Sequence, residues 1–214
     1  MSAGAVSTPS CVLLAERLTD ARPAGAACAD VVGRRVFDTL GALAAARRVA
    51  SSVALRELTG GLGLGDSGSS GVLDDVRLLC AVTRSSEVDD IERRGCTTPG
   101  SVAIPVSLVL AAARGADDAA LMAGVVAGYE AMVGVGEAID GALRLRAGIW
   151  PSHLAAPLSA AAASAVVLGL DADRCAHALA IAATRPVVED WMAGTTDRLI
   201  PAAPRTPQFS CLKG

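Results

Sequence analysis

The sequence has few aromatic residues, two histidines and a single lysine among its 214 residues. Aromatic residues make up 2% of the chain and hydrophobic residues 52%, so the apolar mass is mostly alanine, valine and leucine. Alanine and leucine are the strongest helix formers, and both are small or flexible enough to pack closely. The composition therefore predicts a helical protein whose helices contact one another through small side chains.

Clustered basic residues and metal-ligand spacings are also missing. The formal net charge is −3 and the basic residues are spread out, whereas nucleic-acid binding needs a concentrated basic face. With no CxxC pair and only two histidines, we expect no zinc or other metal site. The six cysteines, which we expect to be reduced and mostly buried, are Cys11, Cys28, Cys80, Cys96, Cys175 and Cys211.

The sequence shows no targeting or membrane signal. No basic segment precedes the first apolar run, and Glu16 and Arg17 interrupt that run, so we expect no signal peptide and a cytoplasmic location. The best candidate for a membrane span is 153–170, which is mostly alanine and serine and contains Pro157. Because a span needs about 20 mainly apolar residues, we interpret this segment as a buried helix of a soluble protein.

Hydrophobic periodicity predicts an all-α fold, because no segment alternates with the period of a strand. Ser101 and Asp117 are expected to cap two of the helices. Gly63, Gly65 and Gly68 match the dinucleotide-binding pattern, but no strand precedes them, so a flexible loop is expected. We predict one helical domain over 1–200 and an irregular tail over 201–214. The predicted helices cover 11–20, 26–49, 72–84, 102–113, 118–144, 153–169 and 172–184, with loops at 60–71, 92–100 and 145–152.

An acidic cluster, Glu87, Asp89 and Asp90, places three carboxylates within four residues. If they are partly buried, their mutual repulsion raises the pKa of at least one of them, and such a group can serve as an acid or a base. The alternative is a solvated helix end, because charge runs usually face water. In that case the acids would be neutralised by Arg84, Arg93 and Arg94.

His153 follows Trp150, Pro151 and Ser152 and is expected in the first turn of a helix. A helix N-terminus disfavours the imidazolium, so we expect a neutral imidazole that can act as a base near pH 7. The alternative is a histidine that caps or packs. His177 lies in the middle of an apolar helix and is expected to be structural.

Five stretches, taken in order, resemble the MmgE/PrpD family. They cover about residues 26–185, and their order and spacing make the match specific. They are FDTLGALAAAR (37–47), EVDDI (87–91), TTPGSVAIPVSLVLAAA (97–113), LMAGVVAGYEAMVGVGEAI (121–139) and GIWPSHLAAPLSAAAASAVVLGLDADRCAHALAIA (148–182).

The resemblance implies a function as well as a fold. The family includes 2-methylcitrate dehydratase, cis-aconitate decarboxylase and an iminodisuccinate epimerase, which use no cofactor and take a proton from a carbon beside carboxylates. Its members are commonly dimers through a helical domain, and their pocket lies between that domain and an α+β lid domain. We expect the helical domain here without the lid.

Residue by residue, the resemblance is incomplete. Glu87, Asp89 and Asp90 match the family's acidic motif, with Glu87 at its first aspartate. The threonine after that motif is replaced by Ile91. The first family histidine is replaced by Thr97 or Thr98 and the second by Trp150, three places before His153. The catalytic lysine has no match, since Lys213, the only lysine, lies in the tail.

These observations leave three functional hypotheses. The first is a diverged lyase, isomerase or cyclase acting on a carboxylate or less polar substrate, with specialised metabolism as one setting. The second is a non-catalytic dimerisation or binding module that forms a homodimer or partners a lid-bearing chain. The third is a truncated remnant of a dehydratase gene. The predicted catalytic residues are Asp89, Asp90, His153 and Glu87, and the predicted substrate-binding residues are Thr97, Thr98, Trp150, Arg84 and Arg146.

Overall fold

The computed structural model describes residues 10–20, 25–49 and 71–184, and this part of the chain contains helices and no strand. The predicted all-α class is confirmed. A single isolated bridge joins Glu92 and Thr97. The helices are α1 (Ser10–Asp20), α2 (Gly25–Ala46), α4 (Val72–Ser85), α5 (Gly100–Arg114), α6 (Asp118–Ala138), α7 (Gly141–Arg146), α8 (Pro151–Val167) and α9 (Ala172–Ala183).

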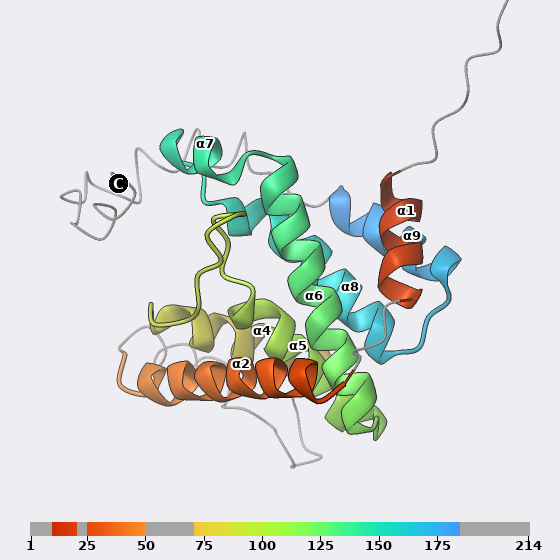
Figure 1. The fold of residues 1–214 in the computed structure, drawn as a ribbon. Helices are drawn as coiled ribbons and strands as arrows, with labels where there is room; N and C mark the ends of the chain where they lie inside the picture. Colours follow the sequence, from red (N-terminus) through yellow and green to blue (C-terminus); the bar gives the residue numbers. More distant parts are fainter. Residues whose placement is uncertain (1–9, 21–24, 50–70, 185–214) are drawn as a thin grey trace, which may run out of the picture.

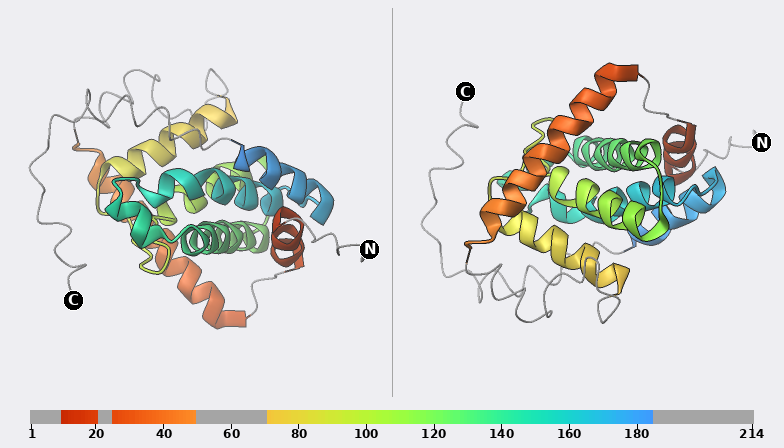
Figure 2. Two further views of the ribbon diagram at one scale, coloured as in Figure 1. Left: turned by 90° about the horizontal axis from the view of Figure 1, so that it is seen from above. Right: turned by 90° about the horizontal axis from the view of Figure 1, so that it is seen from below.

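Helix α6 runs through the middle of the bundle, with α8 and α5 packed along it (Figure 1). Helices α1 and α9 lie together at one end, while α2 crosses the outside of the bundle at an angle (Figure 2). A Cβ atom on Gly128 of α6 would lie 2.6 Å from the Cβ of Ala103, so only glycine allows this approach of α6 to α5. The small residues that the composition led us to expect at contacts therefore lie there.

Among the described helices, α6 is long and apolar enough to cross a membrane by length and composition. The sequence had instead pointed to 153–170, most of which forms α8, a helix of 17 residues. In α6, 44% of the most apolar window is buried inside the bundle. Its apolar character is that of a helix packed between α5 and α8.

Three predicted boundaries are wrong. The helix expected over 118–144 is two helices, because Asp140 adopts a left-handed conformation (φ 52°) between α6 and α7. As a result, the loop predicted over 145–152 is shorter, since α7 extends to Arg146 and α8 begins at Pro151. Ser101 does not cap α5, which begins one residue earlier; its hydroxyl donates to the Thr98 carbonyl at 2.9 Å.

The remaining boundary predictions agree with the structure to within a few residues where it describes the chain. Asp117 caps α6 as expected, because its side chain accepts from the Ala120 N–H at 2.8 Å. The glycine-rich segment around Gly65, the domain boundary at 200 and the tail over 201–214 lie outside the described residues.

Candidate active site

The acidic loop, residues 86–99, joins α4 to α5 and brings the start of α8 to the same place. The loop turns at Glu87 (φ 56°) and Cys96 (φ 51°), two non-glycine residues in the left-handed region. Such residues cluster at functional sites, because their strain persists only where the surroundings fix it. Near its end, Thr98 donates its N–H to the Ser152 hydroxyl oxygen at 3.0 Å, and the two hydroxyls lie 3.1 Å apart. The loop and the first turn of α8 are thus held together.

Arg84, in the last turn of α4, contacts three of the residues predicted for the site. Its guanidinium binds Glu87 at 3.1 Å and Asp89 at 2.9 Å. Its carbon Cζ also lies 5.5 Å from the centre of the Trp150 ring, within the range of a cation–π contact. The flat ring that we predicted to receive a ligand therefore receives the guanidinium, which closes one side of the cluster.

Asp89 is a buried carboxyl with one oxygen left open. Its side chain is 3% exposed, Oδ1 accepts from Arg84, and Oδ2 has no hydrogen-bond partner within the described part of the chain. Burial raises the pKa of Asp89 and outweighs the lowering effects of Arg84 and, in smaller measure, of the nearby Ser101 hydroxyl. The repulsion from Asp90 that the sequence suggested is the smallest contribution. Asp89 thus holds a proton to a higher pH than an ordinary aspartate.

Asp90, the next residue, uses both of its oxygens. Oδ1 accepts the Gly100 N–H at 2.8 Å, and Oδ2 accepts the Tyr129 hydroxyl at 2.8 Å. Arg35 of α2 approaches Oδ2 to 3.7 Å. A Cβ on Gly100 would lie 2.5 Å from Asp90 Oδ1, so the contact needs glycine there. Asp90 therefore ties the acidic loop to α5, α6 and α2.

Tyr129 remains a donor to Asp90 over the whole physiological pH range. Burial, and next the charge of Asp90, raise the pKa of its phenol well above the ordinary value. A protonated phenol and an ionised carboxylate form a charge-assisted hydrogen bond, which is stronger than a bond between neutral groups.

His153 is the third residue of α8 and is exposed. Its pKa is lowered from the ordinary value of 6.5, first by partial burial of the ring and then by the positive charge of Arg84. The neutral imidazole expected from the sequence is confirmed in direction, with burial and Arg84 as its causes. Arg84 thus acts electrostatically on both titrating groups, Asp89 and His153.

The other predicted residues lie around this centre or away from it. Glu87 is 65% exposed and pairs with Arg84. Thr97 and Thr98 are buried beneath the loop, at 0% and 2% exposure, so neither presents its side chain to solvent. Arg146 is exposed at the end of α7. Asp89 and Asp90 are not part of a solvated helix end, the alternative that we had considered.

Of the four arginines considered for substrate binding, Arg84 alone is paired with the buried Asp89. Arg93 is exposed, and Arg94, 69% exposed, pairs with Glu92 and Glu137. The sequence did not single out Ser101, Ser152, Tyr129 or Arg35, although Tyr129 is the only tyrosine in the chain. In the described ranges, no group of three histidine, cysteine, aspartate or glutamate side chains is arranged to hold a metal ion.

Comparison with known proteins gives one match. A family model described as the MmgE/PrpD N-terminal domain matches residues 13–188, which include every helix from α2 to α9 and the whole acidic loop. No curated protein and no solved structure matches the chain.

Proposed function

The chain belongs to the MmgE/PrpD family, and we propose that its helical domain carries the proton-transfer site of a cofactor-independent lyase or isomerase. The substrate class is a small carboxylate with a C–H bond next to the carboxylate group. Arg84 binds that carboxylate, His153 removes the proton and Asp89 donates one.

The chemistry follows from the charges at the site. The neutral imidazole of His153 accepts the proton of the C–H bond, and the electron pair passes into the adjacent carboxylate, which Arg84 neutralises. In an isomerase a proton then returns to the same carbon from the other face. In a lyase the pair expels a group on the neighbouring carbon, and protonated Asp89 gives that group its proton.

Arg84 can bind a substrate because one of its present partners is replaceable. The pair with Glu87 is exposed, with side-chain exposures of 33% for Arg84 and 65% for Glu87, and exposed pairs contribute at most about 1 kcal/mol. A substrate carboxylate in place of Glu87 leaves the pair with buried Asp89 intact.

Asp89 is the observation that carries the proposal. A buried carboxyl whose second oxygen has no partner costs free energy, and a purely structural site avoids that cost. Raised carboxyl pKa values of this kind are characteristic of general acids.

The test is hydrogen exchange at carbon in the purified full chain. In D₂O, proton NMR follows a panel of mono-, di- and tricarboxylates, including cis-aconitate and 2-methylcitrate. We expect exchange in at least one compound. Asp89→Asn and His153→Ala should each slow it by about 100-fold or more, the usual contribution of a positioned acid or base.

His177→Ala is the matched control, because His177 is the other histidine and lies exposed on α9; it should leave the rate unchanged. The assignment of Asp89 and His153 is wrong if both variants exchange at the wild-type rate. Absence of exchange across the whole panel contradicts activity of this chain on its own.

Exposed apolar side chains favour a second candidate, a domain that binds a lid-bearing chain over the acidic loop. Val88 and Ile91 in the loop are 59% and 64% exposed. Large exposed apolar groups beside a polar cluster suit a protein interface. In size-exclusion chromatography with such a chain, a 1:1 complex that Val88→Lys plus Ile91→Lys abolishes supports this candidate, and a complex unaffected by the two changes contradicts it.

A further inference from the structure

Helix α2 has an outer face that no other described segment covers. Its inner face packs on the bundle through Val32, Ala42 and Ala46, each 6% exposed or less. On the outer side, Phe37 is 80% exposed and Leu40 47%. Phe37 is one of only two phenylalanines in the chain, and a phenyl ring so exposed has lost most of the free energy that burial would give it.

The outer face carries a regular seam. Its positions follow the alternating spacing of three and four residues that defines the contact line of a coiled coil. Every member is exposed. We define the α2 seam as Asp30, Gly33, Phe37, Leu40, Ala44 and Arg47.

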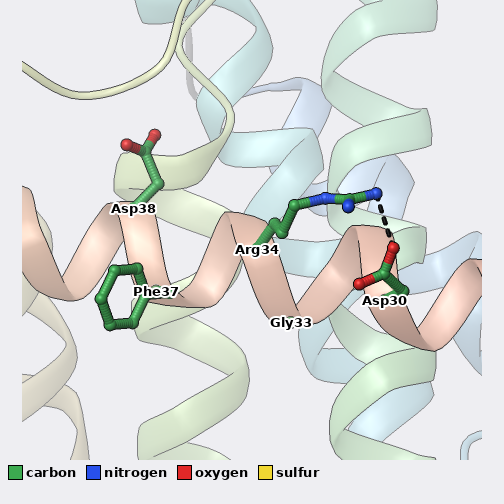
Figure 3. Close-up of a pocket in the computed structure, with 5 residues that line it drawn as sticks. All are labelled: Asp30, Gly33, Arg34, Phe37 and Asp38. Atoms are coloured by element: carbon green, nitrogen blue, oxygen red, sulfur yellow. Dashed lines mark ion pairs between the residues drawn. The ribbon is translucent and has the colours of Figure 1, made fainter.

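The surface around the α2 seam is hollowed. Asp30, Gly33, Arg34, Phe37 and Asp38 line an open depression, shown in Figure 3. A Cβ built on Gly33 would meet no atom within 4 Å, so space beside Phe37 is available to an incoming side chain. The seam thus offers a projecting ring and a depression next to it on one helix face.

We propose that a second copy of this chain docks on the α2 seam with its own α2 running antiparallel. In that arrangement Asp30 faces Arg47 of the second copy, Gly33 faces its Ala44 and Phe37 faces its Leu40. The two large side chains meet near the two-fold axis, the small residues lie further out, and opposite charges meet at both ends. A two-fold interface uses the same patch on both partners, which requires this self-complementary order.

The charges fix the direction. A parallel pair in register places Asp30 against Asp30 and Arg47 against Arg47, which is repulsive at both ends. The antiparallel pair turns both into attractions. The 22 residues of α2 span about 33 Å at 1.5 Å per residue, enough for three heptads. The acidic loop contributes nothing to this seam, so the dimer is independent of the proposed proton chemistry.

The first experiment measures association. Analytical ultracentrifugation of the full chain over a range of concentrations should show a monomer–dimer equilibrium. Phe37→Glu should weaken the dimer by at least tenfold, since it removes the central contact and introduces a repelling charge. Ile181→Glu on α9 is the matched control, since Ile181 is also an exposed apolar residue at 63% and should have no effect. Circular dichroism verifies that both variants fold.

The second experiment tests direction by oxidative cross-linking. A mixture of Gly33→Cys and Ala44→Cys chains should form a disulfide-linked dimer beyond the wild-type background. Each variant alone should not, because the antiparallel arrangement places position 33 opposite 44. A monomeric wild type at high concentration overturns the proposal, as does equal weakening by Phe37→Glu and Ile181→Glu. Cross-links within one chain, or within each variant alone, assign the seam to another occupant or direction and also overturn it.

Discussion

The two halves of the acidic loop carry consecutive aspartates that are buried to almost the same degree and are bound very differently. The Asp89 and Asp90 side chains are 3% and 6% exposed. Asp90 accepts two hydrogen bonds, one on each oxygen, from Gly100 and Tyr129. Asp89 binds Arg84 through one oxygen and leaves the other without a partner in the described structure. Burial alone therefore does not distinguish a reactive carboxyl from a structural one; the bonding of the second oxygen does.

This difference separates stability from chemistry along the loop. A buried, fully bonded carboxylate stabilises the fold, whereas a buried oxygen without a partner destabilises it. The residue whose charge is destabilised also lies beside Arg84, within the electrostatic reach of His153. We therefore interpret Asp90 as the residue that positions the loop and Asp89 as the one that exchanges protons.

The largest effect on stability is expected for Asp90→Ala. The change removes the acceptor of Tyr129 and Gly100 and leaves both donors buried, which should lower the free energy of unfolding by about 3–5 kcal/mol. Denaturant unfolding measures this. The control Asp74→Ala removes an exposed pair with Arg77 and should cost less than about 1 kcal/mol. Equal stability of the two variants would contradict the structural role of Asp90.

A smaller loss is expected for Tyr129→Phe. The ring remains in place, but one charge-assisted hydrogen bond to Asp90 is lost, so unfolding should become easier by about 1.5–3 kcal/mol. Because both changes affect the same bond, the double variant with Asp90→Ala should be clearly more stable than the sum of the single effects implies. Strict additivity in the same denaturant experiment would show that Tyr129 stabilises the fold by other contacts.

Asp89→Asn should have a smaller effect and the opposite sign above neutral pH. The pKa of Asp89 is raised in the fold, so the folded state binds its proton more tightly than the unfolded state. The stability that this gives is present at low pH and declines as pH rises from the unfolded value of about 3.8 through the raised folded value. Relative to the Asp89→Asn variant, the wild type should lose stability across that window.

Thermal unfolding from about pH 3.5 to 8 follows this difference across the window. The wild type and Asp89→Asn should have melting temperatures closest together at the acid end and separate as pH increases, with the variant higher. If the wild type instead gains on the variant as pH increases, the pair with Arg84 outweighs burial, and Asp89 is a second structural carboxylate.

Sequence reasoning identified the acidic loop but could not rank its members. The all-α class and most helices follow from periodicity and composition, because those signals are local. The partners that distinguish Asp90 are not local: Gly100 is 10 positions away and Tyr129 is 39. The bond between Thr98 and Ser152 spans 54 positions. Such contacts depend on the packing of α5, α6 and α8.

The same limit applies to α2. Val31, Val32, Phe37, Leu40 and Leu43 share a helical periodicity, yet only Val32 is buried, and Val31, Phe37 and Leu40 are exposed. An apolar residue at helical spacing shows that a face exists, and the sequence does not say whether its own chain covers that face. Exposure in the folded structure is what separates the packed face of α2 from the α2 seam.

The smallest effect, and the most specific to the Asp89 half of the loop, is a change in the pKa of His153 on Arg84→Gln. Burial is the first cause of its lowered pKa and Arg84 is the second, so removing the guanidinium charge should raise the pKa while leaving it below 6.5. Titration of the imidazole signals by proton NMR measures the change, with His177 as an internal reference on α9. Arg94→Gln is the control, since Arg94 binds Glu92 and Glu137. If both variants leave the His153 pKa unchanged, Arg84 does not connect Asp89 with His153, and His153 is removed from the site.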